Sequence, residues 1–440
     1  MVFVELTQYI LLISFPLALL IIIYRFGAEA ELFKKFPPLQ FHLPPKISQT
    51  GLLIKKILFK RRAVRLFFKI TLLVVISRLI LFLIGYMAIV LFRDESGSFL
   101  ATLELIWNKW DAGHLLDIAK HGYVKDGEMR FFIVFFPLYP MMVRLFAIIT
   151  RNYVWAGFLV SNLSLILACF YLFKLVKLDS DEKTANRAVK FLLIFPQSFF
   201  LNIVYTDSLF LAASIICFYY LRKRRWLWAG FYGCLASFTR NFGILLLIPA
   251  VMEYMKERQV IQKLRNSEFK AVIQEFFTGG GYGILLIAVG LIAYLAINKA
   301  VTGEWFAFLT YQSEHWHNNF GFFGENIKNY VTNCFSWKPS QRLTLWIPEV
   351  FGIFLVTGLI FYGFGKIRLS YLAYMLLYVF VCASSTWLIS GFRYIISLFP
   401  IYILLAIGMR NKIADAILTY LSILMLGFYT VAFVLDFHVM

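Results

Sequence analysis

Long apolar runs alternate with short polar segments along almost the whole chain. Many of the runs reach about 18 residues or more, the length that an α-helix needs to cross the hydrocarbon core of a bilayer. They are continuous, whereas the strands of a membrane β-barrel would alternate apolar and polar positions over segments of about ten residues. The pattern therefore predicts an all-α polytopic membrane protein with about 12 transmembrane helices in one bundle.

The apolar runs place the predicted spans at about 8–26, 70–92, 154–177, 186–204, 207–221, 226–240, 241–255, 278–298, 346–365, 369–388, 394–409 and 413–435. Two further segments are expected at the membrane surface. The run at 131–150 is apolar, but its two prolines and Arg144 favour an interfacial or re-entrant piece. Residues about 102–121 are expected to form one interfacial helix that ends at Gly122, since glycine commonly terminates helices.

Basic residues set the predicted orientation. Lys and Arg concentrate next to apolar runs, mainly at Lys34–Lys35, 55–65, Arg222–Arg225 and Lys256–Arg265. Because cytoplasmic loops carry an excess of Lys and Arg, these segments are assigned to the inside. The large outer loops are then about 93–150 and 299–345. We expect residues 1–69 to form a transmembrane helix with a basic cytoplasmic linker, and residues 70–440 to form the main transmembrane domain.

Composition favours a membrane protein over a nucleic-acid-binding one. Of the 440 residues, 61% are hydrophobic and 15% are charged, which is too little charge to cover a soluble domain of this length. The formal net charge of +19 could suggest nucleic acid, but the cations lie where membrane insertion requires them. We therefore expect contact with membrane lipids and no nucleic-acid partner. The five cysteines follow no disulfide or zinc pattern.

Chemistry-bearing residues gather in the first predicted outer loop. Asp111 and His114 are three residues apart, so on a helix they share a face. A carboxylate near an imidazole suits general-base catalysis on a hydroxyl group, and Trp107 and Trp110 are candidate substrate contacts beside them. The alternative is an exposed aspartate that only keeps this helix in the headgroup region.

A metal site is a weaker interpretation of the same helix. His114, Asp117 and His121 also fall on one helical stripe, a spacing that could hold a divalent cation. However, a histidine in the last turn is already favoured there by the helix dipole. We expect no metal.

Three more charged residues lie between predicted spans, on the predicted outer side. Asp207 is a candidate second catalytic or orienting carboxylate, or alternatively the N-cap of the returning helix. The neighbouring Tyr205 is a candidate substrate contact. Arg240 and Arg393 are candidates for binding the phosphate of a lipid, since a guanidinium binds phosphate bidentately. Their alternative is snorkelling to headgroups.

The second predicted outer loop interleaves aromatic residues with amides, which suits carbohydrate: rings stack on sugar faces and amides bond hydroxyl groups. Its candidate substrate contacts are Gln312, His315 and Trp316. The alternative is an aromatic anchor at the membrane interface.

Four motifs combine along about residues 70–410. They are Trp110-Asp111-Ala112-Gly113-His114 with Phe135-Phe136-Pro137-Leu138-Tyr139-Pro140, then Val204-Tyr205-Thr206-Asp207-Ser208-Leu209-Phe210, Ala236-Ser237-Phe238-Thr239-Arg240-Asn241, and Phe392-Arg393-Tyr394 with Phe399-Pro400. This combination resembles the PIG-V family, the second mannosyltransferase of GPI-anchor assembly, and its prokaryotic homologues.

The resemblance implies a GT-C glycosyltransferase fold, whose first large outer loop carries the catalytic carboxylate. It implies a polyprenyl- or dolichyl-phosphate-linked sugar donor, a glycolipid or lipid-linked acceptor, inversion at the anomeric carbon and no cofactor. Carried over, Asp111 would be the general base, and Arg240 or Arg393 would hold the donor phosphate. The acceptor, the oligomeric state and the choice between mannose and a related sugar stay open.

A transporter or flippase of lipid-linked saccharides is the alternative function. Such a protein would place its polar groups at the membrane midplane and often contain inverted repeats, whereas here the polar groups gather on one predicted face. The single Asn-x-Ser/Thr sequon, at Asn162, lies inside a predicted span. We expect a multi-pass protein of a prokaryotic plasma membrane, or of the ER membrane in a eukaryote, with an extracytoplasmic active site.

Overall fold

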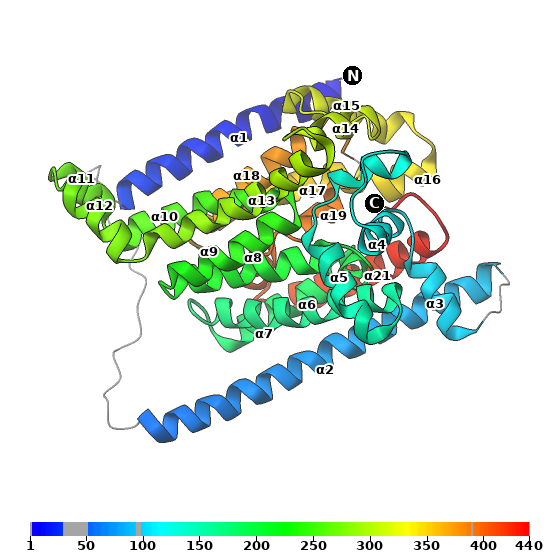
Figure 1. The fold of residues 1–440 in the computed structure, drawn as a ribbon, viewed down its shortest axis with the longest axis horizontal. Coiled ribbons are helices and arrows are strands. Elements are labelled where there is room, and N and C mark those ends of the chain that lie inside the picture. Colours follow the sequence, from blue (N-terminus) through cyan, green and yellow to red (C-terminus); the bar gives the residue numbers. More distant parts are fainter. Residues whose placement is uncertain (1, 30–51, 94–97, 389, 440) are drawn as a thin grey trace.

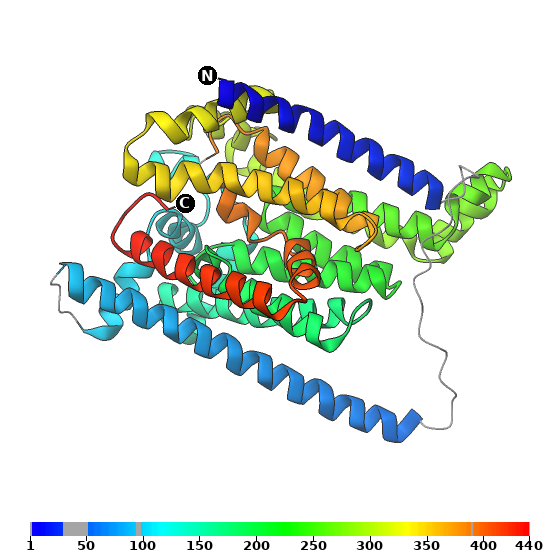
Figure 2. The ribbon, with the colours of Figure 1, turned by 180° about the vertical axis from the view of Figure 1, so that it is seen from behind.

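The computed structural model describes residues 2–29, 52–93, 98–388 and 390–439. Over these residues the chain is helical and forms no β-strand, apart from one isolated bridge between Phe320 and Ser385. The long helices lie side by side in an elongated bundle (Figure 1), and the view from behind shows the same arrangement (Figure 2). The all-α class predicted from the sequence is confirmed.

The α-helices are α1 (Val2–Glu29), α2 (Leu52–Arg93), α3 (Phe99–Trp107), α4 (Asp111–His121), α5 (Leu138–Thr150), α6 (Tyr153–Val176), α7 (Glu182–Ile194), α8 (Asp207–Arg222), α9 (Trp226–Thr239), α10 (Leu247–Glu257), α11 (Val260–Arg265), α12 (Phe269–Thr278), α13 (Leu286–Thr302), α14 (Ala307–Glu314), α15 (Phe323–Ser336), α16 (Pro339–Gln341), α17 (Ile347–Gly363), α18 (Leu369–Ala383), α19 (Gly391–Ile395), α20 (Pro400–Gly408) and α21 (Lys412–Val434). Short 3₁₀ segments are η2 (Glu128–Val134), η3 (Ser198–Leu201), η4 (Asn241–Leu246) and η5 (Gly281–Leu285), and η6 (Arg342–Trp346) is π-helical.

Six helical stretches of the described chain are long and apolar enough to cross a membrane, namely Val4–Glu29, Ala63–Arg93, Tyr153–Val176, Gly281–Thr302, Pro339–Gly363 and Lys412–Val434. Other predicted spans correspond to shorter helices. For example, α8 has 16 residues and rises about 24 Å, less than the hydrocarbon thickness of about 30 Å. A multi-pass membrane architecture follows, and the total of about 12 spans stays a prediction.

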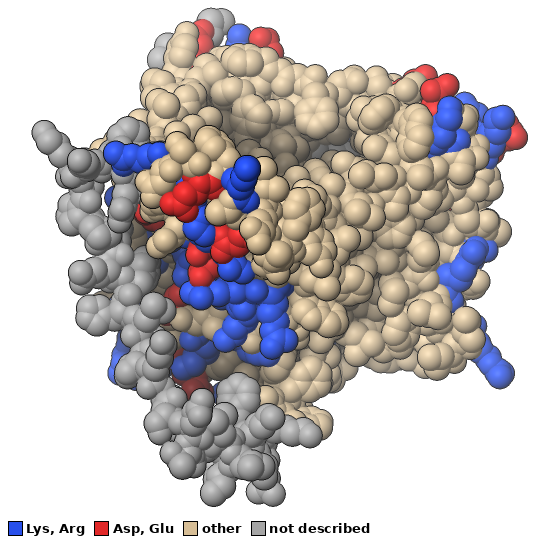
Figure 3. Space-filling model, turned by 60° about the vertical axis from the view of Figure 1, so that its left-hand side comes forward, with Lys and Arg blue, Asp and Glu red and all other residues tan. Residues whose placement is uncertain are grey.

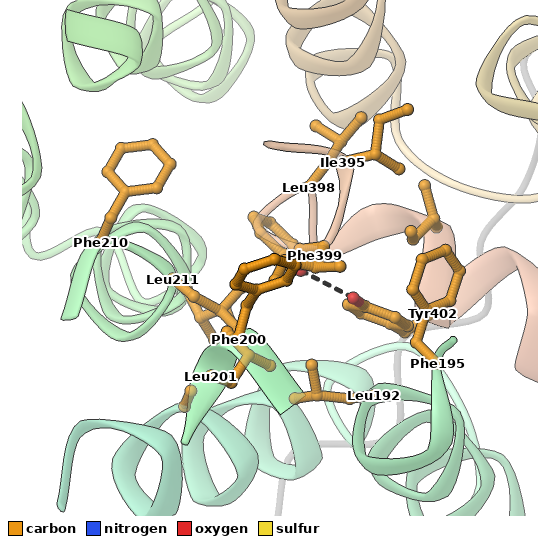
Figure 4. Close-up of a cluster of buried hydrophobic side chains, with 14 of the residues drawn as sticks. Leu192, Phe195, Phe200, Leu201, Phe210, Leu211, Ile395, Leu398, Phe399 and Tyr402 are labelled. Atoms are coloured by element: carbon orange, nitrogen blue, oxygen red, sulfur yellow. Dashed lines mark hydrogen bonds between the residues drawn. The ribbon is translucent and has the colours of Figure 1, made fainter. Parts of the chain in front are cut away.

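The core lies where these short helices end. Figure 4 shows buried side chains from α7, η3, α8, α19 and α20 meeting there, namely Leu192, Phe200, Leu211, Ile395 and Tyr402. Tyr402 donates a hydrogen bond to the backbone oxygen of Ile396 at 2.7 Å, and so ties α20 to the turn that follows α19. Broken helices are tolerated at membrane depth where protein surrounds them, and this packing supplies those surroundings.

The first two helices extend beyond their predicted spans. Helix α1 packs against α15, α17 and α18, with the Phe15 ring 5.4 Å from the Phe323 ring. Helix α2 is one continuous element of 42 residues, so the expected boundary at residue 69 falls inside it. The predicted basic linker is therefore helical from Leu52 onward, whereas Lys34 and Lys35 lie outside the described residues.

Three predictions for the first outer loop have different outcomes. The single helix predicted over 102–121 is wrong, because Asn108–Trp110 separates α3 from α4 and Trp110 has a φ of 53°. The predicted end at Gly122 is confirmed, since this residue terminates α4 with a φ of 81°. The proline-containing run bends by 110° between η2 and α5, as a re-entrant loop or a broken span would, so its predicted interfacial or re-entrant position stays a prediction.

The predicted topology can be tested by cysteine labelling. Lys and Arg side chains gather at the end of the bundle that Figure 3 brings forward. We expect the exposed positions Lys125 and His317 to label from outside the cell when replaced by cysteine, and exposed Arg224 to label only after permeabilisation. The unmodified protein is the control, because four of its five cysteines are buried. Labelling of position 125 only from the cytoplasm would reverse the topology.

Candidate functional site

Four charged residues that are distant in sequence form one connected cluster. The Arg393 guanidinium bridges two carboxylates: its Nη1 lies 2.9 Å from Asp111 Oδ2, and its Nε lies 3.2 Å from Asp207 Oδ2. The other Asp207 oxygen is paired with Arg240. The structure therefore brings together all four charged residues that the sequence singled out as catalytic carboxylates or phosphate ligands.

Each member of the cluster stands at a helix end or break. Asp111 begins α4 directly after the turn at Asn108–Trp110, and Asp207 begins α8. Arg240 lies in extended backbone between α9 and η4, and Arg393 lies in the five-residue α19. The breaks let polar side chains from four separate elements converge at one place.

Burial differs sharply within the cluster. Asp207 is fully enclosed, whereas the Asp111 side chain is 33% exposed. The guanidinium carbon of Arg240 lies 4.7 Å from the centre of the Tyr394 ring, and 5.8 and 5.9 Å from those of Phe210 and Phe242. Desolvating charges is costly unless they are paired, and here every member has an opposite charge beside it. Asp111 is the one carboxylate of the cluster that solvent or a substrate reaches.

Two alternative interpretations of these residues are wrong. Neither Arg240 nor Arg393 snorkels to a headgroup, because both side chains are buried and paired with carboxylates of the cluster. Asp207 is not an N-cap: it is the first residue within α8, and the capping position belongs to Thr206, whose side chain makes no capping hydrogen bond. Its carboxylate instead forms ion pairs with Arg240 and Arg393.

Tyr205 joins the cluster to the turn that precedes Asp111. Its ring lies under the Arg393 guanidinium at 4.1 Å and stacks on Phe200 with ring centres 5.5 Å apart. Its hydroxyl group donates a hydrogen bond to the backbone oxygen of Lys109 at 3.1 Å. An arginine held over aromatic faces keeps a defined orientation.

His114 lies one turn from Asp111 but packs among aromatic rings. Its ring centre is 4.3 Å from that of Phe132 and 5.6 Å from that of Phe135. Burial among these rings lowers the pKa of His114, while the nearby Asp111 and Asp117 carboxylates oppose that shift. The imidazole therefore stays neutral to a lower pH than a free histidine.

The two predicted outer loops contact each other beside this histidine. His315 stacks on Phe131 with ring centres 4.4 Å apart, and Trp316 meets Phe135 edge-on at 5.8 Å. Gln312 lies half-buried in α14, and α14 packs on η2. The second-loop residues predicted to bind substrate thus lie next to the aromatic rings that surround His114.

Trp107 and Trp110 lie in different surroundings. Trp110 is exposed and tilts against His438 with ring centres 5.5 Å apart. Trp107 is fully buried, because the break after α3 turns it into the core against Phe82 and Phe433. The prediction that Trp107 contacts substrate beside Asp111 is therefore wrong, because its side chain is enclosed in the core.

The metal-binding interpretation concerned the helical stripe of His114, Asp117 and His121. Across the described residues, no group of three or more His, Cys, Asp or Glu side chains has an arrangement that could hold a metal ion.

Sequence reasoning passed over two buried charges inside predicted spans. Glu349 in α17 accepts hydrogen bonds from two backbone N–H groups at the start of α19. Arg78 in α2 donates to the backbone oxygens of Ser198 and Leu193 at 2.8 and 2.9 Å, and so satisfies carbonyls where α7 ends. The available signal was an ionisable residue within an apolar run, which by itself marks a position of interest.

Comparison with known proteins gives two matches. The family model for dolichyl-phosphate-mannose-protein mannosyltransferase matches residues 136–277. A curated relative, GPI mannosyltransferase 2 of the fission yeast Schizosaccharomyces pombe, is 25% identical over 305 residues, or 66% of this chain and 62% of the relative. The match thus spans less than two thirds of the relative's length. Together with the multi-pass helical architecture, these matches support the assignment of the chain to the PIG-V-like family of GT-C glycosyltransferases.

Proposed function

We propose that the chain is a membrane mannosyltransferase that moves mannose, or a related hexose, from a polyprenyl- or dolichyl-phosphate carrier to a lipid-linked or glycolipid acceptor. The observation that carries the proposal is the bridge from Asp111 through Arg393 to Asp207. A partly exposed carboxylate beside a fixed guanidinium provides a proton acceptor next to a phosphate ligand. The two matches support the reaction class, since both carry mannosyltransferase in their names.

In the proposed reaction, the acceptor hydroxyl oxygen attacks the anomeric carbon of the donor sugar. Asp111 takes the hydroxyl proton, the new glycosidic bond forms, and the bond between the anomeric carbon and the phosphate oxygen breaks. The electron pair of that bond leaves with the lipid phosphate, and attack from the opposite face inverts the anomeric carbon. One base is enough for this step, and a cation beside the phosphate stabilises the charge that develops on it.

Arg393 is the better candidate for the donor phosphate. The guanidinium groups of Arg240 and Arg393 are both buried among aromatic rings. However, Arg393 contacts the partly exposed Asp111, whereas the carboxylate paired with Arg240 is the fully enclosed Asp207. We assign to Arg240 the task of neutralising Asp207, which in turn orients Arg393. Asp207 then acts as an orienting carboxylate and not as a second base.

The aromatic and amide residues around Asp111 and His114 are proposed to contact the sugars. Trp110 directly precedes Asp111 and is exposed, Trp316 contacts Phe135, which lies beside His114, and His114, whose pKa is lowered by burial, offers a hydrogen-bonding group. Gln312 and His315 would bond hydroxyl groups from α14. Tyr205 would act through its contact with Arg393.

The direct test is substrate consumption. Purified protein in lipid is incubated with labelled polyprenyl-phosphate mannose, polyprenyl-phosphate glucose or a nucleotide sugar, each with a lipid extract as the acceptor source. We expect the mannosyl lipid to be consumed and its label to appear in a new lipid. Movement of an intact lipid-linked saccharide across vesicles, without bond cleavage, would instead make the protein a transporter.

Replacing Arg393 by lysine is expected to weaken donor binding roughly 10- to 100-fold, which matches the loss of a charged hydrogen bond worth about 1.5–3 kcal/mol. Lysine keeps the charge but lacks the planar fork that contacts two groups at once. The measurement is donor affinity by isothermal titration, with acceptor affinity expected to be unchanged. Arg130→Lys, on a partly exposed surface, is the control. Unchanged donor affinity in Arg393→Lys would show that Arg393 does not bind the donor phosphate.

The proposal also includes the membrane in which the protein lies and the side that Asp111 faces. We place the chain in the plasma membrane of a prokaryote, or in the ER membrane if the source is eukaryotic, with Asp111 on the extracytoplasmic side. The basic segments at the opposite helix ends support this orientation.

A further inference from the structure

Glu349 is a buried carboxyl group that the proposed reaction does not use. It lies in α17, within the apolar stretch Pro339–Gly363, and is 1% exposed. None of the ion pairs among the described residues includes it. An ionisable group kept within a membrane span without a counter-charge is costly, so it is expected to have a task.

Both carboxyl oxygens of Glu349 face the start of α19. Oε1 accepts a hydrogen bond from the backbone N–H of Gly391 at 2.9 Å, and Oε2 accepts one from that of Phe392 at 2.7 Å. The first N–H groups of a helix have no partner within the helix, and the N-terminal end of the helix dipole favours negative charge. Glu349 therefore satisfies two donors of a helix that has only five residues.

Gly391 makes this contact possible. A Cβ atom added at Gly391 would overlap Glu349 Oε2 and also press on the Leu388 side chain. The residue is in a helical position, so what requires glycine here is the close approach of the carboxyl group and not the backbone conformation.

Arg393 follows two residues after Gly391, within the same turn of helix. An isolated five-residue helix has almost no stability of its own, so its geometry depends on its neighbours. We infer that Glu349 is a positioning residue: by holding the first two N–H groups of α19, it fixes the direction in which Arg393 reaches Asp111 and Asp207. The inference rests on the proposed role of Arg393 at the donor phosphate.

The test replaces Glu349 by glutamine. The amide keeps the size and one acceptor, but its NH2 group then faces one of the two backbone N–H groups. Hydrogen exchange of the segment 390–396, measured by mass spectrometry without substrate, is expected to accelerate at least several-fold. The KM for the lipid-phosphate sugar is expected to rise about tenfold or more, because small displacements of a positioned group have large effects. The KM for the acceptor should not change.

Thr357→Val is the matched control. Thr357 is buried in the same helix, and its hydroxyl group bonds only within that helix, to Ile353. Simple destabilisation of α17 lowers the active fraction and hence kcat, but it leaves the donor KM unchanged. The control therefore separates a positioning role from a structural one.

Gly391→Ala probes the same contact from the other side. It should reproduce the exchange and KM changes of Glu349→Gln, and the double variant should add little to either single one. Unchanged exchange in 390–396 for Glu349→Gln would overturn the inference, and so would faster exchange with an unaltered donor KM. Failure of the proposed function is seen separately, since the wild-type protein would then consume no lipid-phosphate sugar.

Discussion

Asp111→Asn is expected to abolish sugar transfer while leaving donor binding in place. The substitution keeps the size of the side chain and removes the proton acceptor, and a general base contributes about 10²–10⁴-fold to the rate. Asp111 is the candidate because its side chain is partly exposed, whereas Asp207 is enclosed. The measurement is the initial rate of transfer from labelled polyprenyl-phosphate mannose, together with donor affinity for the same preparation.

Asp126→Asn is the control for this prediction. Asp126 lies in the same predicted outer loop, just after Gly122, and is exposed, so its removal changes the loop charge equally without touching the cluster. The fold should survive in Asp111→Asn, because Arg393 keeps its pair with Asp207 and a partly exposed ion pair contributes about 1 kcal/mol or less. A rate close to that of the wild type would disprove the assignment and make Asp207 the next candidate.

The members of the charged cluster were predictable from the sequence, but their pairing was not. Asp111, Asp207, Arg240 and Arg393 stand out because each interrupts apolar sequence at a cost. Asp111 and Arg393 are separated by 282 residues, and the apolar pattern contains no information on which helix ends meet. The contact of Arg393 with the partly exposed Asp111, which favours Arg393 as the phosphate ligand, likewise follows from packing alone.

Helix breaks explain most of the differences between expectation and structure. Periodicity predicts one helix over 102–121, yet Trp110 adopts a left-handed φ that only the tertiary contacts impose. That turn sends Trp107 into the core and Trp110 to the surface. Glu349 lies inside the predicted span 346–365. Its partners are backbone N–H groups, which no residue type in the sequence identifies, so its role could not be predicted.

Asp207→Asn is expected to have the largest effect on stability. The carboxylate is fully enclosed and receives Arg240 on one oxygen and Arg393 on the other. Without its charge, Arg393 retains Asp111, but Arg240 loses its ion-pair partner and stays buried among aromatic rings. Breaking a buried pair by removing one partner typically costs about 3–5 kcal/mol, because a charge is left buried and uncompensated. The measurement is the free energy of unfolding in mixed detergent micelles.

Two further variants test whether burial of the charge causes the loss of stability in Asp207→Asn. Asp436 also bridges two cations, Arg93 and Lys109, but it is about half exposed, so Asp436→Asn should cost about 1 kcal/mol or less. Adding Arg240→Met to Asp207→Asn should restore part of the lost stability, since the uncompensated charge disappears and an apolar side chain fills its place. If Asp207→Asn and Asp436→Asn were equally stable, water would have to reach the cluster, and Arg240 would again become a candidate for the donor phosphate.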